Sequence, residues 1–124
     1  MGGSGKDKQL DYKSISEQIS ELVLKYRPER AGLEKLFFTN NQKTAMAVAE
    51  ARGVIILTLA NHNVPIFEFT PQQVKQAVSA YGSAGKAQVE RMVRLILNIK
   101  EPIKPDDAAD ALAIAICCAN TTIY

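Results

Sequence analysis

The chain has 124 residues, of which 47% are hydrophobic and 23% charged, a composition typical of one globular domain and unlike that of a disordered or fibrous chain. The longest apolar runs, 53–60 and 108–119, fall short of the ~18–20 residues of a membrane span, and no apolar secretion signal opens the chain. Its two cysteines are adjacent, Cys117 and Cys118, and lack the spacing of a metal site. We therefore expect a reduced, soluble, cytoplasmic protein without a membrane partner.

The net charge of +2 is unevenly distributed along the chain. Residues 72–100 contain five basic residues and one acidic residue, a net charge of +4, which leaves −2 for the remainder. A local basic segment in a nearly neutral protein favours an anionic partner bound on one face. A solvated helix face is the alternative explanation, and charge alone does not decide between the two.

Hydrophobic periodicity and capping signals predict seven elements after a flexible lead-in over residues 1–13. In chain order we expect a helix from the capping box at Ser14 to Pro28, a strand over 31–38, a helix from Asn40 or Asn41 to about Ala60, a strand over 64–69, a helix from Pro71, a helix after Gly85, and a helix over about 106–120. Two buried strands separated by a helix imply a parallel pair with a right-handed crossover. Because an α/β sheet usually has about five strands, either a second copy completes the sheet or strands are missing before Ser14.

Three aspartates, Asp106, Asp107 and Asp110, open the otherwise apolar last helix. Acidic residues in a first helical turn complement the helix dipole, which is a sufficient structural explanation for Asp106 and Asp107. That explanation is weaker for Asp110, which shares a helix face with Asp107 among small apolar residues. A divalent cation would relieve the repulsion and desolvation of two such carboxylates. Hard oxygen ligands select Mg²⁺, with Mn²⁺ as an alternative, and Glu34 in the first strand could supply a third carboxylate for a two-metal phosphoryl-transfer site.

Several segments of the chain together resemble one protein family, in unbroken order from about Ser14 to Ile116. They are EKLFF at 34–38, EARGV at 50–54, QVKQ at 73–76, GSA at 82–84, Lys86, and DAADALA at 107–113. This ordered set is similar to RuvC, the bacterial Holliday-junction resolvases. The resemblance implies an RNase H-like fold, a three-layer α/β/α architecture, over residues 14–124. It also implies a homodimer that resolves four-way DNA junctions by paired Mg²⁺-dependent nicks in recombination and repair.

The resemblance also implies roles for individual residues. Glu34, Asp107 and Asp110 match the family's catalytic, metal-holding acids. Lys75 and Lys86 match basic residues that contact DNA near the scissile phosphate, and Phe37 matches an aromatic residue that contacts bases at the centre of the junction. The helix around 44–55 matches the dimer-forming helix, and a branch-migration motor complex is a further partner that the resemblance suggests.

One departure from the family pattern concerns the beginning of the chain. The family opens with a strand carrying Gly-Ile-Asp-Pro-Gly, whose aspartate is the central metal ligand, followed by two more strands, and this sequence has no counterpart to them. We therefore expect an N-terminally truncated resolvase that lacks the first three strands. Glu68 is a spare acid, but its position at a strand end favours a solvated side chain. Three hypotheses follow: an endonuclease, a catalytically impaired fragment that binds junction DNA without cleaving it, or a non-functional fragment with exposed sheet edges.

Overall fold

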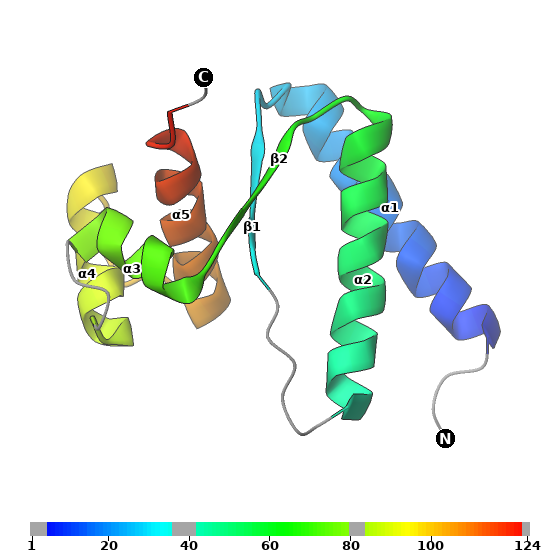
Figure 1. Ribbon diagram of the computed structural model, residues 1–124, viewed down its shortest axis with the longest axis horizontal. Helices are drawn as coiled ribbons and strands as arrows, with labels where there is room; N and C mark the ends of the chain where they lie inside the picture. The colour runs from blue at the N-terminus through cyan, green and yellow to red at the C-terminus, as the bar shows by residue number, and fades with distance from the viewer. Residues whose placement is uncertain (1–4, 36–41, 80–83, 123–124) are drawn as a thin grey trace. The chain divides into compact units, whose positions relative to one another are not determined.

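The structure, a computed structural model, describes residues 5–35, 42–79 and 84–122 (Figure 1). Its elements are α1 (Gly5–Tyr26), β1 (Ala31–Glu34), α2 (Gln42–Asn61), β2 (Ile66–Phe69), α3 (Pro71–Ser79), α4 (Lys86–Leu97) and α5 (Asp106–Ala119). The chain divides into two compact units: α1 and α2 with the strand residues Ala31 and Ile66 form the first, and the remaining strand residues with α3, α4 and α5 form the second. All seven predicted elements are present, in the predicted order.

The first unit is the pairing of α1 with α2. Its core is the cluster of Val23, Leu59 and Val64. Polar contacts add to this core: the Tyr12 hydroxyl donates to Glu50 over 2.8 Å, and the Ser16 and Thr58 hydroxyls are 2.9 Å apart. The hydrogen bond from Tyr12 lowers the pKa of the Glu50 carboxyl and raises the pKa of Tyr12 itself.

The predicted start of the first helix at Ser14 was wrong, because α1 begins at Gly5. Ser14 is not a cap here; its Oγ lies 2.9 Å from the Gln18 side-chain amide, one turn further along the same helix. The helix begins earlier because of tertiary contacts with α2. Lys8 and Tyr12 contact Glu50 on α2, and these contacts favour helix over residues that local capping signals place outside it.

The two strands form a parallel pair, as predicted. The Ala31 N–H donates to the Pro65 carbonyl and the Lys35 N–H to the Phe69 carbonyl, both over 2.8 Å. The sequence offset is the same at both bonds, which is the register of parallel strands. The strands are shorter than predicted, since β1 ends at Glu34 and β2 begins at Ile66. In the described part of the chain the sheet contains these two strands.

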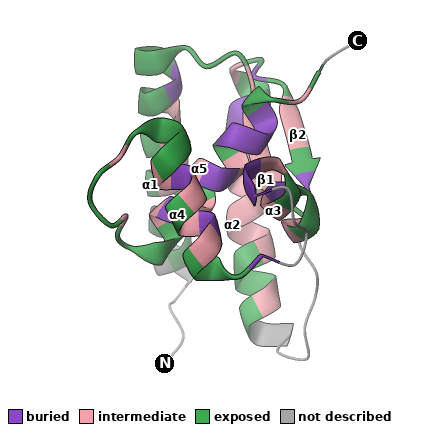
Figure 2. Ribbon diagram, turned by 90° about the vertical axis from the view of Figure 1, so that its left-hand side faces the viewer, coloured by how far each residue is buried: buried purple, intermediate pink, exposed green. Residues whose placement is uncertain are grey.

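The second unit packs α3, α4 and α5 against one another. Thr70 and Gln73 form a reciprocal capping box at the start of α3: the Gln73 N–H donates to Thr70 Oγ1 over 3.1 Å, and the Thr70 N–H donates to Gln73 Oε1 over 2.8 Å. Val93 on α4 is fully buried, and the buried positions of α5 include Ala113. Figure 2 shows buried segments on both helices. Because this core holds α3, α4 and α5 together, it fixes the charged residues at their ends relative to one another.

Gly32 in β1 lies against α5 so closely that a side chain would collide with it. A Cβ at this position would be 3.0 Å from Cys118 Cβ and 3.1 Å from Ile114 Cγ2. We predict that Gly32→Ala destabilises the fold by about 1–3 kcal/mol, the usual cost of overpacking, as a lower urea midpoint. Gly53→Ala is the control, because no atom lies within 4 Å of its new Cβ and alanine is favoured over glycine in a helix. A Gly32→Ala protein as stable as wild type would contradict the prediction.

One helix in the described part of the chain, α2, is long and apolar enough to cross a membrane by length and composition. The segment is Thr44–Asn61, with a mean hydropathy of 1.3, and 11% of it is buried. The expectation from the apolar runs 53–60 and 108–119 did not consider this longer window, because the window includes the charged residues Glu50 and Arg52. Its exposed apolar residues include Met46, at 64%, and Leu57, at 61%.

Candidate active site

Glu34, Lys75, Lys86 and Asp110 line one pocket of the second unit, with a volume of about 230 Å³. We call it the carboxylate pocket. The remaining lining residues are apolar: Pro71, Val74, Val89, Ala113 and Ile114. The four charged residues come from four elements, β1, α3, α4 and α5 in that order. They are brought together by the packing of the three helices and the position of β1 against α5.

The carboxylate pocket combines a buried apolar wall with accessible charges. Val74, Val89 and Ala113 are buried. Glu34 and Lys86 are exposed, and Asp110 is half-buried. Apolar walls with a few convergent charged groups are typical of sites that bind and orient a charged ligand.

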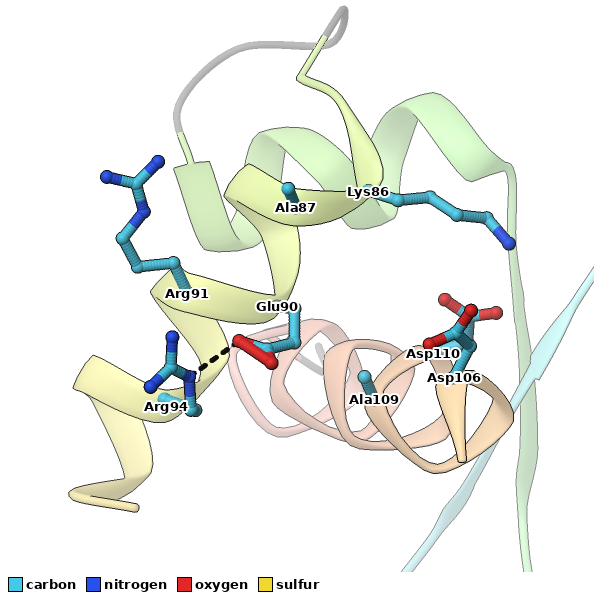
Figure 3. Close-up of a pocket in the computed structure, with 8 residues that line it drawn as sticks. All are labelled: Lys86, Ala87, Glu90, Arg91, Arg94, Asp106, Ala109 and Asp110. Carbon is cyan, nitrogen blue, oxygen red and sulfur yellow. Dashed lines mark hydrogen bonds and ion pairs between the residues drawn. The ribbon is translucent and has the colours of Figure 1, made fainter. Parts of the chain in front are cut away.

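A second pocket adjoins the first and shares Lys86 and Asp110 with it. It has a volume of about 500 Å³ and is lined by Lys86, Ala87, Glu90, Arg91, Arg94, Asp106, Ala109 and Asp110. We call it the α4–α5 pocket (Figure 3). Figure 3 shows Lys86 extending toward the end where Asp106 and Asp110 lie, while Glu90 pairs with Arg94 further along α4. Glu90 and Arg94 were not predicted as site residues, although the four-residue spacing from Lys86 to Glu90 to Arg94 places all three on one face of a helix.

Asp107 lines neither of these pockets. It is exposed in the first turn of α5, beside Asp106. The helix-dipole interpretation, offered above for Asp106 and Asp107, accounts for this position of Asp107 without a ligand. The three predicted acids are therefore not equivalent here: Glu34 and Asp110 share a pocket, whereas Asp107 lies outside it.

The donor chemistry of the carboxylate pocket suits a hard cation. In residues 5–35, 42–79 and 84–122, no group of three or more histidine, cysteine, aspartate or glutamate side chains is placed to hold a metal ion. Two carboxylates are nonetheless a normal protein contribution to a Mg²⁺ site, because Mg²⁺ keeps several waters and takes further oxygens from a substrate phosphate. Glu34 and Asp110 fit such a site.

The other residues singled out from the sequence have structural environments. Phe37 lies outside the described residues. The His62 ring nitrogen Nε2 is 3.0 Å from Ser20 Oγ, which ties the end of α2 to α1. Cys117 and Cys118 are buried and unbridged, and burial raises the pKa of the Cys117 thiol, which opposes a nucleophilic role. Glu68 is exposed in β2.

Comparison with known proteins gives one consistent family. The family model described as "Crossover junction endodeoxyribonuclease RuvC" matches residues 4–118. The chain is 50% identical over 109 residues to RuvC of Alkaliphilus oremlandii, covering 88% of this chain and 66% of that protein. It is 47% identical over 115 residues to RuvC of Pseudothermotoga lettingae, covering 92% of this chain and 71% of that protein. The chain thus spans about two thirds of the length of these relatives.

Among solved structures, the chain is similar to Thermus thermophilus RuvC in complex with a Holliday junction substrate. The TM-score is 0.87 at 35% identity, over 94% of this chain and 72% of that one. A second Thermus thermophilus RuvC structure gives a TM-score of 0.84 at 34% identity, over 96% of this chain and 72% of the other.

These likenesses define the class of protein as RNase H-like, in agreement with the mixed helix and parallel-strand architecture and with the prediction from sequence. Within that class, the chain belongs to the RuvC family of crossover junction endodeoxyribonucleases.

Proposed function

We propose that this chain acts as a structure-selective DNA endonuclease, which resolves Holliday junctions by paired Mg²⁺-dependent nicks in homologous recombination and repair. The observation that carries the proposal is the carboxylate pocket, where two acids and two lysines from four elements line one cavity. Acids beside lysines match the two needs of phosphodiester hydrolysis, a metal ion and neutralisation of phosphate charge. Membership in the RuvC family supports the same reaction.

In this proposal each charged residue of the pocket has a separate role. Glu34 and Asp110 would hold Mg²⁺. Asp107, which lies outside the pocket in the first turn of α5, is proposed as a third ligand on the family resemblance alone. A Mg²⁺ ion held there would supply Lewis-acid stabilisation of the charge that develops on the phosphate in the transition state. Lys75 and Lys86 attract and orient the phosphate backbone from α3 and α4. The buried wall of Val74, Val89 and Ala113 holds the elements that carry these charges in fixed positions, while the charges themselves remain accessible to a ligand.

The proposed partners follow from the family and from the exposed surfaces. Four-way junction DNA is the substrate, and Phe37, which follows β1 by three residues, is proposed to stack on a base at the centre of the junction. A branch-migration motor complex is proposed as a further partner, and the cytoplasm as the site of action. A second copy of the chain supplies the second nick.

The proposed dimer contact is the exposed apolar stripe of α2. The side chains of Met46 and Leu57 lie on one side of this helix and are exposed. We predict that Leu57→Glu converts a dimer into monomers, because a buried unpaired carboxylate is strongly unfavourable in an apolar interface. Sedimentation velocity measures the change. Leu95→Glu on α4 is the control, since Leu95 is 67% exposed but lies outside the stripe. A dimer that survives Leu57→Glu contradicts this assignment.

The direct test of the function is the nicking of a synthetic mobile four-way junction in Mg²⁺. Symmetric nicks in two strands of like polarity are expected, with no nicking in EDTA and none of a linear duplex of the same sequence. Soluble, folded protein that leaves the junction intact would contradict the proposed endonuclease.

A second candidate function is the binding of four-way junctions without cleavage. The observation that favours it is that no group of three metal-ligating side chains forms within the described residues. It predicts a salt-dependent gel shift with junction DNA and no metal-dependent nicking. The same junction substrate therefore distinguishes the two functions in one experiment.

A further inference from the structure

Glu90 connects α4 to the segment that leads into α5. Its Oε1 accepts a hydrogen bond from Arg94 Nε over 2.6 Å, and its Oε2 accepts one from the backbone N–H of Ile103 over 3.3 Å. The side chains are sheltered, with 23% of Glu90 and 29% of Arg94 exposed. Both carboxylate oxygens of Glu90 are therefore used, one within α4 and one across to the loop.

The loop that Glu90 contacts leads directly into α5. Ile103 precedes the first residue of α5, Asp106, by three positions. The N-cap of α5 is Pro105, which makes no side-chain cap hydrogen bond. The packing of α4 on α5 uses apolar residues such as Val93 and Ala113, and apolar packing is not directional. The hydrogen bond to Ile103 is thus a directional restraint on the entry to α5.

This restraint lies close to the charged groups of the site. Lys86, Glu90 and Arg94 follow one another at four-residue intervals on α4, and all three line the α4–α5 pocket together with Asp106 and Asp110 (Figure 3). The contact of Glu90 with the loop therefore lies about one helical turn from Lys86.

We propose that Glu90 is a positioning residue, which holds the acidic first turns of α5 in place for the metal ion through its hydrogen bond to Ile103. The ion pair with Arg94 fixes the Glu90 carboxylate itself. The inference rests on the proposed function, because it assigns Glu90 to the support of the same metal-holding acids. Glu90 itself holds no ion in this proposal. Residues that orient metal ligands typically change metal affinity by about 10–100-fold when they are replaced.

The test measures Mn²⁺ binding to the full chain without DNA, by the electron paramagnetic resonance signal of free Mn²⁺, in Glu90→Ala and Glu90→Gln. Glu90→Ala is expected to weaken Mn²⁺ binding by about tenfold. Glu90→Gln retains an oxygen acceptor for the Ile103 N–H, so a smaller loss of about two- to threefold is expected. Amide exchange at Ile103, which reports the hydrogen bond itself, is expected to accelerate in Glu90→Ala and much less in Glu90→Gln.

Glu101→Ala is the matched control, because it removes the same charge from an exposed position in the same loop. Equal Mn²⁺ affinity of wild type and Glu90→Ala, or an equal loss in Glu101→Ala, would overturn the positioning role. If Glu90→Ala does not fold, Glu90→Gln decides: loss of folding there as well would make Glu90 a fold residue and overturn the proposal. A wild-type chain that binds no Mn²⁺ would instead contradict the proposed function.

Discussion

Glu34→Gln is expected to abolish junction nicking while leaving junction binding within about twofold of wild type, because phosphate contacts by lysine supply most of the affinity. The substitution keeps the size of the side chain and removes one of the two carboxylates of the carboxylate pocket. Loss of several kcal/mol of transition-state stabilisation corresponds to a fall in rate of about 1000-fold. Single-turnover nicking of a four-way junction and a gel shift in EDTA measure the two quantities.

Glu68→Gln is the matched control for this experiment. Glu68 lies in β2 as Glu34 lies in β1, and both are exposed, but Glu68 does not line the carboxylate pocket. We expect Glu68→Gln to nick at the wild-type rate. An equal loss in both variants would assign the effect to the strand pair, and persistent nicking by Glu34→Gln would exclude Glu34 as a metal ligand.

The elements of the fold were predictable wherever their signals are local. Thr70 and Pro71 place the start of α3 correctly, because the capping hydrogen bonds form within four residues of the chain. The start of α1 was not predictable in the same way. It depends on contacts of Lys8 and Tyr12 with Glu50, which is about forty residues away in sequence, and local capping signals contain no information about such contacts.

The kinds of residue in the site could be predicted from the sequence, but which of them line one pocket could not. Periodicity and charge singled out the aspartates of α5, Glu34 as a third carboxylate, and the basic segment that contains the lysines of α3 and α4. The family resemblance added the assignment of the two lysines to the same site. The sequence already distinguished Asp110 from Asp107, because the helix-dipole explanation is weaker for Asp110, but the family resemblance assigned both to the metal, and only Asp110 lines the carboxylate pocket. That difference depends on how α5 packs. Glu90 was not assigned to the site because one of its two partners is a backbone N–H, at Ile103, which no side-chain pattern can indicate.

The positions of the basic side chains in the structure distinguish the two interpretations of the segment 72–100, a face that binds an anionic partner and a solvated helix face. If the segment is only a solvated face, its cations are interchangeable. In the structure they are not: Lys75 and Lys86 line the carboxylate pocket, Arg94 is paired with Glu90, and Lys100 is exposed outside both pockets. Position, rather than net charge, should therefore decide which cations bind DNA.

Lys75→Ala and Lys86→Ala are each expected to weaken junction binding and to reduce the slope of log K against log salt by about 0.9, the value for the loss of one phosphate contact. Gel shifts between about 50 and 200 mM salt measure this slope. Lys100→Ala removes the same charge from the same segment and is expected to leave the slope unchanged. Equal slopes for all three variants would mean that the segment acts through its total charge, and the carboxylate pocket would then not be where the phosphate backbone binds.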